Sequence, residues 1–499
     1  MTQLQKFLSA QDSNLPWQMI WFHNNGEPVI GILPKVSWSL YFSSQKNDDG
    51  KALYHLNTIC RDDSPTVQAS TVTYEAWQQL LIDYTDNFKQ PNQAYEIKDN
   101  PSYHHGLMGF IGYDISANEL SPNADIQQAP NQPCAMLGHY DIYLKPVQKN
   151  DEKFWQLMIH QPKSEWSKKS KINQLIGYLD AFNEQLASNS ATTNQPLPLN
   201  LQAAWQISDY QMAFEQSQNY LLNGDCYQIN LTQAWRSEPL FESTALIDYL
   251  PMLDAKTQAP FAGYLALPYF QNGALENQHK NNLGFELLSC SPELFFTFNR
   301  NNHHLTITTK PIKGTVPRGR DAFEDEQFKA KLQDSEKDRS ENVMIVDLLR
   351  NDLGKYAQIG SVKVPKLFAI ESFSNVHHLV STITATLKPT VHPLTVLFGS
   401  LPAGSITGTP KKRAVEIISS LENQARGAYC GTMGFMNFDG SGQWNVLIRT
   451  LQASVNDDGQ KQISVWAGGG ITVASNCAAE YQECLDKVGN VLTVLSQSN

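Results

Sequence analysis

Short runs of alternating apolar and polar residues, separated by turns or by long connections, restrict the fold of this chain more than any other feature. Alternation with a period of two is typical of a strand that buries one face. Strands spaced in this way favour a large antiparallel α+β body over a doubly wound parallel sheet. The sequence predicts such strands at 227–235, 294–299, 304–309, 444–455 and 462–468.

Helical segments are expected between and around these strands. Their apolar residues recur every three or four positions, or their composition favours a helix. The sequence predicts helices over 74–88, 209–222, 335–355 and 475–495. For the second of them, Ser208 is placed to cap the start, and Asn223 followed by Gly224 is a typical end.

A polar stretch containing prolines divides the chain. Residues 183–202 read NEQLASNSATTNQPLPLNLQ and show no hydrophobic period, which is typical of a linker. A chain of 499 residues is also long for a single core. We therefore expect an N-terminal domain over 1–185, a linker over 186–204 and a C-terminal domain over 205–499.

Charge and composition exclude several classes of partner. The net charge is −11 and there is no long run of Lys or Arg, which argues against nucleic acid or an anionic membrane. No apolar stretch approaches the roughly 20 residues that span a bilayer, and the first residues do not resemble an export signal. The seven cysteines are scattered without a C-x-x-C pair, as expected of reduced thiols in a cytoplasmic protein without a zinc site.

The stretch TTKPIKGTVPRG, residues 308–319, places one lysine where an expected strand breaks. Pro311 ends the strand pairing, and Gly314 allows a turn or a close approach to a ligand. Most lysines at strand ends are exposed to solvent. This window by itself therefore leaves Lys313 open as either a surface residue or a functional one.

Carboxylates stand at unusual places on two of the expected helices. Glu341 heads the apolar face of the helix over 335–355, because apolar residues follow it at positions i+4, i+7 and i+8. A carboxylate on such a face needs a cation or a hydrogen-bond donor. Glu480 and Glu483 stand three residues apart on one face of the helix over 475–495.

A glycine run precedes that last helix. The backbone amides of Gly468, Gly469 and Gly470, between a strand and the helix, are able to meet an anionic ligand. Two carboxylates from separate helices, with no histidine or thiolate nearby in sequence, suit a hard ion such as Mg²⁺. Ordinary surface charge and a flexible glycine turn are the alternatives.

Glu293 enters an apolar strand directly after a proline, in SCSPELFF at 289–296. A carboxyl group held against apolar neighbours has a raised pKa, as a general acid at neutral pH requires. The alternative is that Glu293 marks the exposed start of the strand.

Taken together, these segments resemble the chorismate-utilising enzymes from about residue 205 to 495. The N-terminal part is similar but weaker, with LPWQMI (15–20) and HHGLMGFIGYDI (104–115). The matching words in the second part are GDCYQINLTQ (224–233), SPELFF (291–296), PIKGT (311–315), DRSENVMIVDLLRNDLG (338–354), VHHLVSTI (376–383), GSITGTPKKRAVEII (404–418), RGAYCGTMGF (426–435), LIRTL (447–451), AGGGI (467–471) and EYQECLDKV (480–488).

Lys313 distinguishes between branches of this family. Anthranilate synthases and isochorismate synthases have alanine there, whereas PIKGT is similar to aminodeoxychorismate synthase component I. That resemblance implies the large subunit of a heterodimer, an aminotransferase that aminates chorismate at C4 for 4-aminobenzoate and folate synthesis. It also implies a small glutaminase subunit that supplies ammonia, since no cysteine here lies in the G-x-C-x-G setting of a glutaminase nucleophile.

The resemblance also implies a fold and the roles of residues. The fold is of the anthranilate synthase component I type, a large two-layer sandwich of antiparallel sheets with flanking helices, whose chorismate-binding catalytic domain is 205–499. Lys313 attacks C2 of chorismate, Glu293 protonates the departing C4 hydroxyl, and ammonia then enters at C4 and expels the lysine. Glu341 and Glu483 hold Mg²⁺ against the substrate carboxylate, and Glu480 supports them. The implied chorismate-site residues are Gly314, Thr315, His378, Ser405, Thr407, Tyr429, Arg449, Gly468, Gly469 and Gly470.

One segment departs from the family pattern. Many relatives bind tryptophan in a pocket of the N-terminal domain, partly built by a basic and serine-containing segment after the LPW word. Here that segment reads HNNGEPVIGILPKVSW (23–38) and does not match. The departure counts against a bound tryptophan and against feedback control by it.

Two rival functions remain. Anthranilate synthase component I, in which ammonia attacks C2 directly and pyruvate leaves, is disfavoured by Lys313. A non-catalytic homologue should have lost some of Glu293, Lys313, Glu341 and Glu483, and all four are present.

Overall fold

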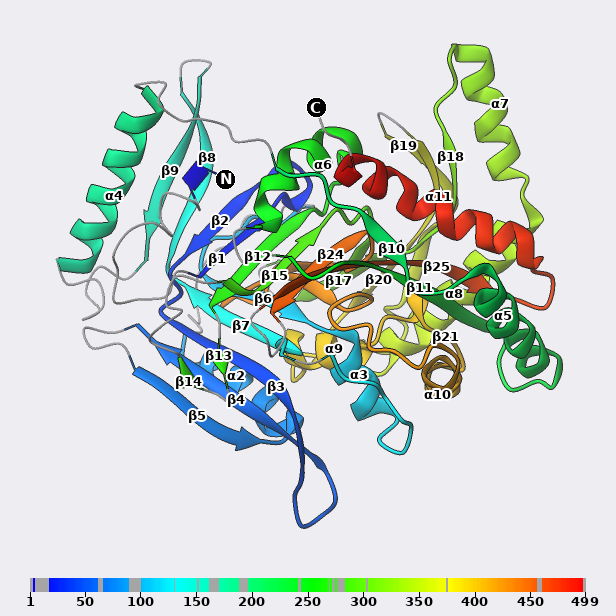
Figure 1. Ribbon diagram of the computed structural model, residues 1–499, viewed down its shortest axis with the longest axis horizontal. Coiled ribbons are helices and arrows are strands. Elements are labelled where there is room, and N and C mark those ends of the chain that lie inside the picture. Colours follow the sequence, from blue (N-terminus) through cyan, green and yellow to red (C-terminus); the bar gives the residue numbers. More distant parts are fainter. Residues whose placement is uncertain are drawn as a thin grey trace.

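Two large antiparallel sheets form the centre of the computed structural model (Figure 1). The structure describes residues 3–4, 18–61, 66–88, 100–129, 131–149, 152–160, 170–187, 196–240, 244–268, 270–271, 274–275, 283–301, 304–373, 376–455 and 460–496. The apolar core between the sheets contains side chains of both. Phe110 of one sheet, for example, stacks on Phe285 of the other with ring centroids 5.5 Å apart. The predicted two-layer α+β sandwich is therefore confirmed.

Each sheet takes strands from both ends of the chain. The first sheet runs in the order β10 (Leu201–Ala203), β11 (Gln228–Ser237), β25 (Lys461–Ile471), β24 (Thr450–Val455), β15 (Leu283–Ser289), β12 (Gly263–Pro268), β1 (Met19–Phe22), β2 (Val29–Ile32), β8 (Ile142–Lys149) and β9 (Glu152–Ile159), with β21 (Gly408–Thr409) paired to β11.

The second sheet runs in the order β18 (Ile312–Pro317), β20 (Val376–Thr386), β17 (Leu305–Lys310), β16 (Leu294–Arg300), β23 (Gly442–Val446), β22 (Thr432–Asn437), β6 (Gly106–Ile111), β7 (Ala135–Tyr140), β3 (Val36–Lys46), β4 (Ala52–Cys60) and β5 (Thr66–Val72), with β19 (Lys363–Ser372) paired to β20. A separate small hairpin joins β13 (Phe270–Gln271) to β14 (Ala274–Leu275).

The two parts of the chain meet strand to strand. β1 pairs with β12 in the first sheet, and β6 pairs with β22 in the second, so both sheets continue across the predicted domain boundary. Gly109 lies opposite Gly434 in the second of these pairs. Residues 188–195 of the predicted linker lie outside the described residues, and the division into domains at 186–204 stays a prediction.

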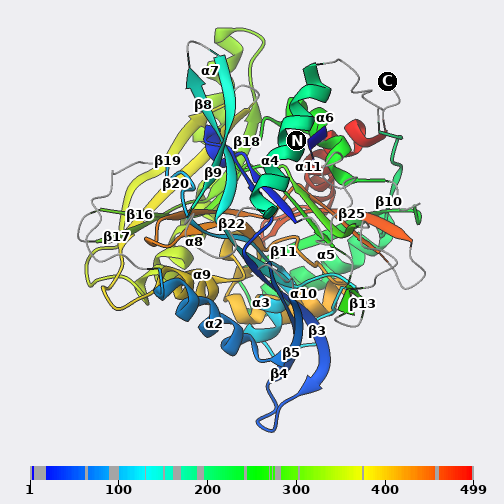
Figure 2. The same ribbon diagram turned by 90° about the vertical axis from the view of Figure 1, so that its left-hand side faces the viewer.

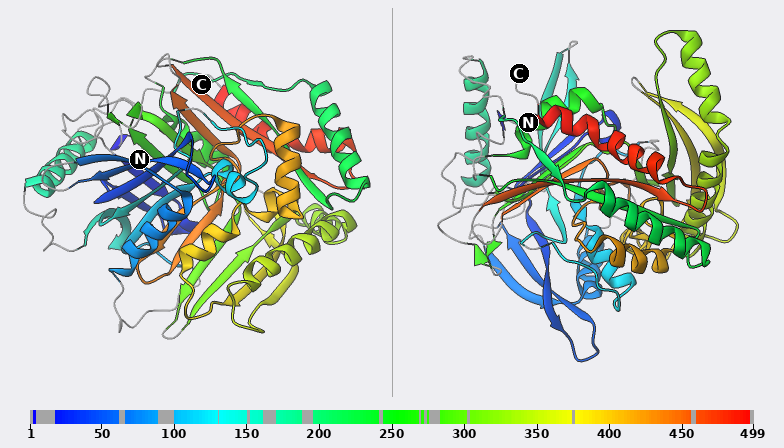
Figure 3. Two further views of the ribbon diagram at one scale, coloured as in Figure 1. Left: turned by 90° about the horizontal axis from the view of Figure 1, so that it is seen from below. Right: turned by 45° about the vertical axis from the view of Figure 1, so that its right-hand side comes forward.

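Helices cover the outer faces of both sheets. α11 (Cys477–Ser496) lies along β25 and contacts α6 (Leu250–Thr257), whereas α5 (Ile207–Leu222) and α10 (Lys411–Glu422) pack side by side against β11 (Figures 1 and 3). α7 (Ala322–Gln333) and α8 (Glu336–Gly354) cover β18 and β20 at the other end. α2 (Tyr74–Asp86) and α9 (Pro393–Ser400) contact each other (Figure 2), and α2 also contacts β4 of the second sheet. The remaining helical segments are η1 (Asn24–Gly26), α3 (Tyr113–Leu120), α4 (Ser170–Ala187), η3 (Leu246–Tyr249) and η5 (Gly404–Ile406). No described helix combines the length and apolar composition that a bilayer crossing requires.

All four predicted helices are present, but one cap is different. α5 begins after Gln206, whose side chain accepts from the backbone of Asp209, while the backbone N–H of Gln206 donates to the Asp209 carboxylate at 2.8 Å. This reciprocal capping box satisfies two backbone donors at once, so the helix starts before Ser208, and the prediction that Ser208 caps it is wrong. The predicted end at Asn223 is confirmed.

The strand predicted over 444–455 is two strands in different sheets. β23 pairs with β16 and β22 in the second sheet, and β24 pairs with β15 and β25 in the first. The chain changes sheet between them, where Arg449 has the left-handed φ of 50°. Residue alternation does not reveal such a crossing, because both halves have the composition of a strand.

The prediction that Gly468, Gly469 and Gly470 lie between a strand and a helix is also wrong. β25 extends to Ile471, so the three glycines are paired with β11 instead of lying between a strand and a helix. A Cβ atom on Gly468 would lie 2.1 Å from the carbonyl oxygen of Leu231. Glycine is therefore required there by the close approach of the neighbouring strand.

Candidate active site

Lys313 lies in the first half of β18, after the break that Pro311 makes between β17 and β18. The pairing of β18 with β20 shifts register between Ile312 and Thr315, so Lys313 lies at this irregularity. Its Nζ atom is 3.5 Å from Oε2 of Glu341, and the two side chains are 12% and 10% exposed. Lys313 is thus not the solvent-exposed strand-end lysine that the sequence window left open.

Gly314 brings β18 close to the start of α8. Its φ is +80°, a conformation that favours glycine. A Cβ atom at this position would lie 2.7 Å from Cδ1 of Leu332 and 2.9 Å from Cγ of Asp338. The absence of a side chain therefore lets the strand that carries Lys313 approach the helix that carries Glu341.

Glu293 is buried at the start of β16, with 6% of its surface exposed. Burial raises the pKa of its carboxyl group to about 7, although a hydrogen bond from Ser405 and the charges of Lys313 and Lys487 act in the opposite direction. A carboxyl group with this pKa is partly protonated at neutral pH and is able to donate a proton. The prediction of a raised pKa for Glu293 is thus supported by its burial. The alternative, that Glu293 marks an exposed start of the strand, is wrong.

The three predicted metal carboxylates lie with three lysines between α8, α11 and β18. Lys337 contacts two of them, since its Nζ atom is 2.8 Å from Oε1 of Glu480 and 4.0 Å from Oε1 of Glu341. Glu483 pairs with Lys487 at 2.7 Å. We call these carboxylates and lysines, Lys313, Lys337, Glu341, Glu480, Glu483 and Lys487, the carboxylate–lysine cluster.

Burial differs among the carboxylates of this cluster. Glu341 is buried, and burial raises its pKa above the ordinary value despite the nearby Lys313 and Lys337. The side chain of Glu483 is 47% exposed. Its partial burial raises the pKa, but the charges of Lys487, Lys337 and Lys313 outweigh that effect and lower the pKa of Glu483.

The carboxylates fit a hard divalent ion that keeps part of its hydration shell. Oε1 of Glu341 is buried and accepts no hydrogen bond from any described residue, so this oxygen is available to a cation. Gly469 faces the same place, because a Cβ atom there would lie 3.4 Å from Oε2 of Glu480 and 3.9 Å from Oε1 of Glu483. Among the described residues, no three His, Cys, Asp or Glu side chains gather closely enough to hold a metal by themselves. An ion such as Mg²⁺ is held by one or two carboxylates together with water and substrate oxygens.

Thr315 and His378 face each other across β18 and β20, and Thr315 Oγ1 is 2.8 Å from Nδ1 of His378. Burial lowers the pKa of His378 to about 4, and the charge of Arg449 contributes in the same direction. His378 is therefore neutral at physiological pH.

Ser405 and Thr407 belong to the turn that contains η5. Ser405 donates toward Glu293, as described above. Thr407 is fully buried, and its hydroxyl donates to the carbonyl oxygen of Ala403 at 2.7 Å. The structure thus places Ser405 against the predicted acid, whereas the hydroxyl of Thr407 holds the turn.

Arg449 and Tyr429 complete the predicted set. Arg449 is mostly buried, its pKa is lowered by burial, and no carboxylate of the described part of the chain lies within ion-pair distance of it. Tyr429 is buried and stacks on Trp466, with ring centroids 5.9 Å apart. A buried guanidinium without an anionic partner is suited to binding the carboxylate of a ligand.

Lys337 and Lys487, the other two lysines of the cluster, were not among the predicted site residues. Lys337 lies four residues before Glu341 and Lys487 lies four residues after Glu483. Helical i, i+4 spacing was a usable signal for both pairs. The 2.8 Å contact between Lys337 and Glu480 joins two helices that are distant in sequence. No local sequence pattern predicts a contact of this kind.

Asn24, in the segment that departs from the family pattern, lines a small cavity with Phe22, Phe261 and Met433. The volume of this cavity is about 10 Å³, which is about what a single water molecule needs.

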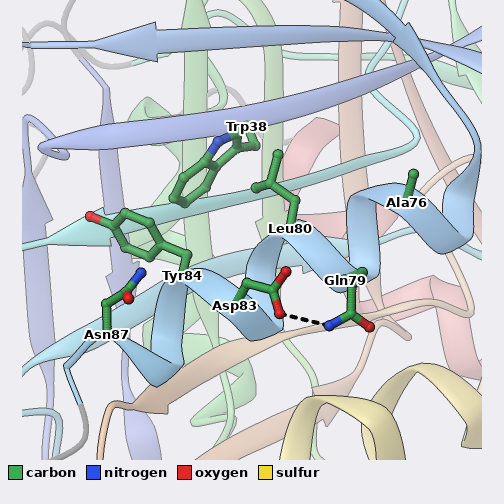
Figure 4. Close-up of a pocket in the computed structure, with 7 residues that line it drawn as sticks. All are labelled: Trp38, Ala76, Gln79, Leu80, Asp83, Tyr84 and Asn87. Carbon is green, nitrogen blue, oxygen red and sulfur yellow. Dashed lines mark hydrogen bonds between the residues drawn. The ribbon is translucent and has the colours of Figure 1, made fainter.

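A larger cavity of about 600 Å³ lies away from the cluster, between α2 and β3 (Figure 4). Trp38 and Tyr84 form its aromatic wall, with ring centroids 4.7 Å apart. Its carboxylate, Asp83, accepts a hydrogen bond from Gln79 at 2.7 Å. None of the described residues that line this cavity is a lysine or a histidine, so this lining differs in chemistry from the carboxylate–lysine cluster.

Comparison with known proteins agrees with this geometry. A family model described as chorismate binding enzyme matches residues 40–493. The chain is 39% identical over 442 residues to aminodeoxychorismate synthase component 1 of Salmonella typhimurium, which covers 87% of this chain and 85% of that protein. It is 38% identical over 396 residues to the protein of the same name from Escherichia coli, which covers 79% of this chain and 77% of that protein.

A solved structure supports the fold. The crystal structure of anthranilate synthase component I from Streptococcus pneumoniae is similar with a TM-score of 0.64, at 22% identity, and covers 97% of this chain and 93% of that one. At this identity the comparison shows the shared architecture, and the finer chemistry depends on the residues.

Proposed function

This chain belongs to the family of chorismate-binding enzymes, and we propose that it is the large subunit of an aminodeoxychorismate synthase, which aminates chorismate at C4. The relatives from Salmonella typhimurium and Escherichia coli carry that name and match most of the chain. The observation that carries the proposal is Lys313, a buried amine close to both Glu341 and the protonatable Glu293.

In the proposed reaction, Lys313 acts as nucleophile and Glu293 as general acid. The free amine of Lys313 attacks C2 of chorismate, both ring double bonds shift, and the C4 hydroxyl leaves as water with the proton of Glu293. Ammonia then attacks C4, both double bonds shift back, and the lysine leaves C2 as a free amine. The ammonium formed at C4 returns one proton to Glu293, so both groups are restored, and the product is 4-amino-4-deoxychorismate.

The environment of Glu293 makes this proton arrangement accessible. In water, moving a proton from lysine to glutamate spans about six pKa units, or roughly 8 kcal/mol. The folded value of about 7 for Glu293 removes roughly 3 kcal/mol of that difference. The neutral pair holds the same number of protons as the ion pair, so burial favours it without loss of a proton to solvent.

Residues around the two catalytic groups are proposed to bind the substrate and a metal. Glu341 and Glu483 would hold Mg²⁺ with support from Glu480, and the ion would supply positive charge for a substrate carboxylate. Arg449 is suited to a second carboxylate, because it is mostly buried without an acidic partner in the described part of the chain. Gly314, Thr315, His378, Ser405, Tyr429 and the glycines of β25 would line the remaining surface.

The nitrogen source is proposed to be a separate small glutaminase, which makes the enzyme a heterodimer. The name "component 1" of the two bacterial relatives implies a partner component for those proteins. The cysteines of this chain are not placed on a glycine-flanked elbow, the usual position of a glutaminase nucleophile. With glutamine as the ultimate donor, the enzyme would act as an aminotransferase, in the service of 4-aminobenzoate and folate synthesis.

Identification of the product tests this proposal. The purified chain with chorismate, Mg²⁺ and ammonia should form the 4-amino product, and Lys313→Ala should lose it, with any residual activity shifting toward the 2-amino isomer. Lys310→Ala is a matched control, because Lys310 is a neighbouring lysine paired with Glu371 at the surface. Formation of the 2-amino isomer by the unaltered chain would indicate anthranilate synthase chemistry instead.

A further inference from the structure

We propose that Lys337 is an internal cation that neutralises the metal carboxylates in the free chain and must move aside when the metal binds. The inference rests on the proposed function in one respect, namely that Glu341, Glu480 and Glu483 are the carboxylates of the metal. It adds a determinant of metal affinity that is neither a metal ligand nor a catalytic group.

The geometry places one ammonium between two buried carboxylates. Lys337 donates to Oε1 of Glu480 at 2.8 Å, and Ser475 donates to the same oxygen at 2.7 Å. Oε1 of Glu341 is 4.0 Å from the ammonium, too far for a hydrogen bond, and accepts none from the described residues. The ammonium therefore holds Glu480 and compensates the charge of Glu341 without occupying its oxygen.

Exposure shows that Lys337 is able to leave while its partners stay. The side chain of Lys337 is 46% exposed, whereas those of Glu341 and Glu480 are 10% and 1% exposed. Removing the cation that pairs with a buried carboxylate strongly destabilises the folded protein. A divalent ion that arrives at these oxygens supplies the missing charge, and the long flexible side chain of Lys337 then turns into solvent.

The other two lysines of the cluster are less suited to this role. Lys313 is 12% exposed, so its ammonium has little access to solvent. Lys487 is held by a second contact, a hydrogen bond of 2.9 Å to the carbonyl oxygen of Gly468, and its partner Glu483 is half-exposed. Lys337 therefore combines buried partners with a route to solvent.

Two opposite effects follow for a variant without the charge. Lys337→Met keeps the length and the apolar stem of the side chain but removes the competitor of the metal, so Mg²⁺ should bind more tightly. The same change leaves Glu341 and Glu480 uncompensated in the metal-free chain and removes a link between α8 and α11. Metal-free Lys337→Met should therefore melt at a lower temperature, and Mg²⁺ should raise its melting temperature more than that of the unaltered chain.

Calorimetric titration with Mg²⁺ alone, without chorismate, measures the first effect. We expect Lys337→Met to lower Kd about tenfold, which corresponds to about 1.4 kcal/mol. Lys337→Arg keeps the charge and should stay within about threefold of the unaltered chain. Lys329→Met is a matched control for net charge, because Lys329 pairs with Asp325 and Glu326 on α7, and it should leave Kd unchanged.

An unchanged or weaker Kd in Lys337→Met would overturn the inference and make Lys337 a structural link only. Equal tightening in Lys329→Met or Lys337→Arg would also overturn it, since the effect would then be due to net charge or to side-chain shape. Thermal melting in chelator and in Mg²⁺ confirms that each variant is folded. Because no chorismate is present, the outcome is independent of which isomer the enzyme makes.

Discussion

Replacement of Glu293 by glutamine should abolish amination and, at alkaline pH, stabilise the protein. The folded pKa of about 7 lies above the ordinary value of 4.5. The folded state therefore binds more protons than the unfolded state between these two values, and stability falls as pH rises through that window. Above pH 7 the ionised, buried carboxylate destabilises the fold by roughly 3 kcal/mol, at 1.36 kcal/mol for each pKa unit.

Glu293→Gln has no charge to bury, so its advantage should be greatest at pH 8 and disappear near pH 5. With an unfolding entropy of about 2 cal/mol/K per residue, a chain of this length would show a rise in Tm of about 3 °C at pH 8. Amination should fall by a factor of about 10² to 10⁴, the usual contribution of a general acid. Glu371→Gln is the control, because Glu371 is a partly exposed carboxylate paired with Lys310.

Thermal unfolding at pH 5, 6, 7 and 8, followed by circular dichroism, together with initial rates of amination, measures both effects. A Glu293→Gln chain that is no more stable than the unaltered one at pH 8, or whose gain is the same at pH 5, would refute the burial argument. Retained amination would refute the role as acid, whatever the stability.

Three further predictions test the rest of the site. Glu341→Ala or Glu483→Ala should raise the Mg²⁺ concentration needed for half-maximal rate and raise KM for chorismate together, and full activity of the unaltered chain in excess chelator would contradict the metal site. Arg449→Met should raise KM for chorismate by about tenfold to a hundredfold through loss of a charged hydrogen bond, and an unchanged KM in initial-rate assays would exclude contact with a substrate carboxylate. The isolated chain should form product with ammonium salts at alkaline pH but not with glutamine, as measured by product chromatography, and glutamine-dependent amination free of contaminating glutaminase would exclude the two-subunit assembly.

Local patterns in the sequence predicted several of the helices and strands, and they predicted the carboxylates and Lys313 of the candidate site. Alternation and helical spacing predicted strands and helices that are present, because both reflect which side of a short segment is buried. The word PIKGT placed Lys313 beside Pro311 and Gly314, and the structure shows the strand break and the positive φ that these residues produce. Glu341 was expected on a buried helix face for the same local reason.

Contacts between distant segments were decided by the tertiary structure. The burial of Glu293, the change of sheet near Arg449 and the pairing of the β25 glycines with β11 all depend on strands far away in the chain. The meeting of Lys337 with Glu480 likewise requires the first turns of α8 and α11, which are distant in sequence, to lie close together. Residue spacing determines on which face of its own helix or strand a side chain lies. The charges and the dielectric around that side chain come from the elements packed against the face. These neighbouring elements therefore determine the pKa of an acid and the ion-pair partner of a lysine.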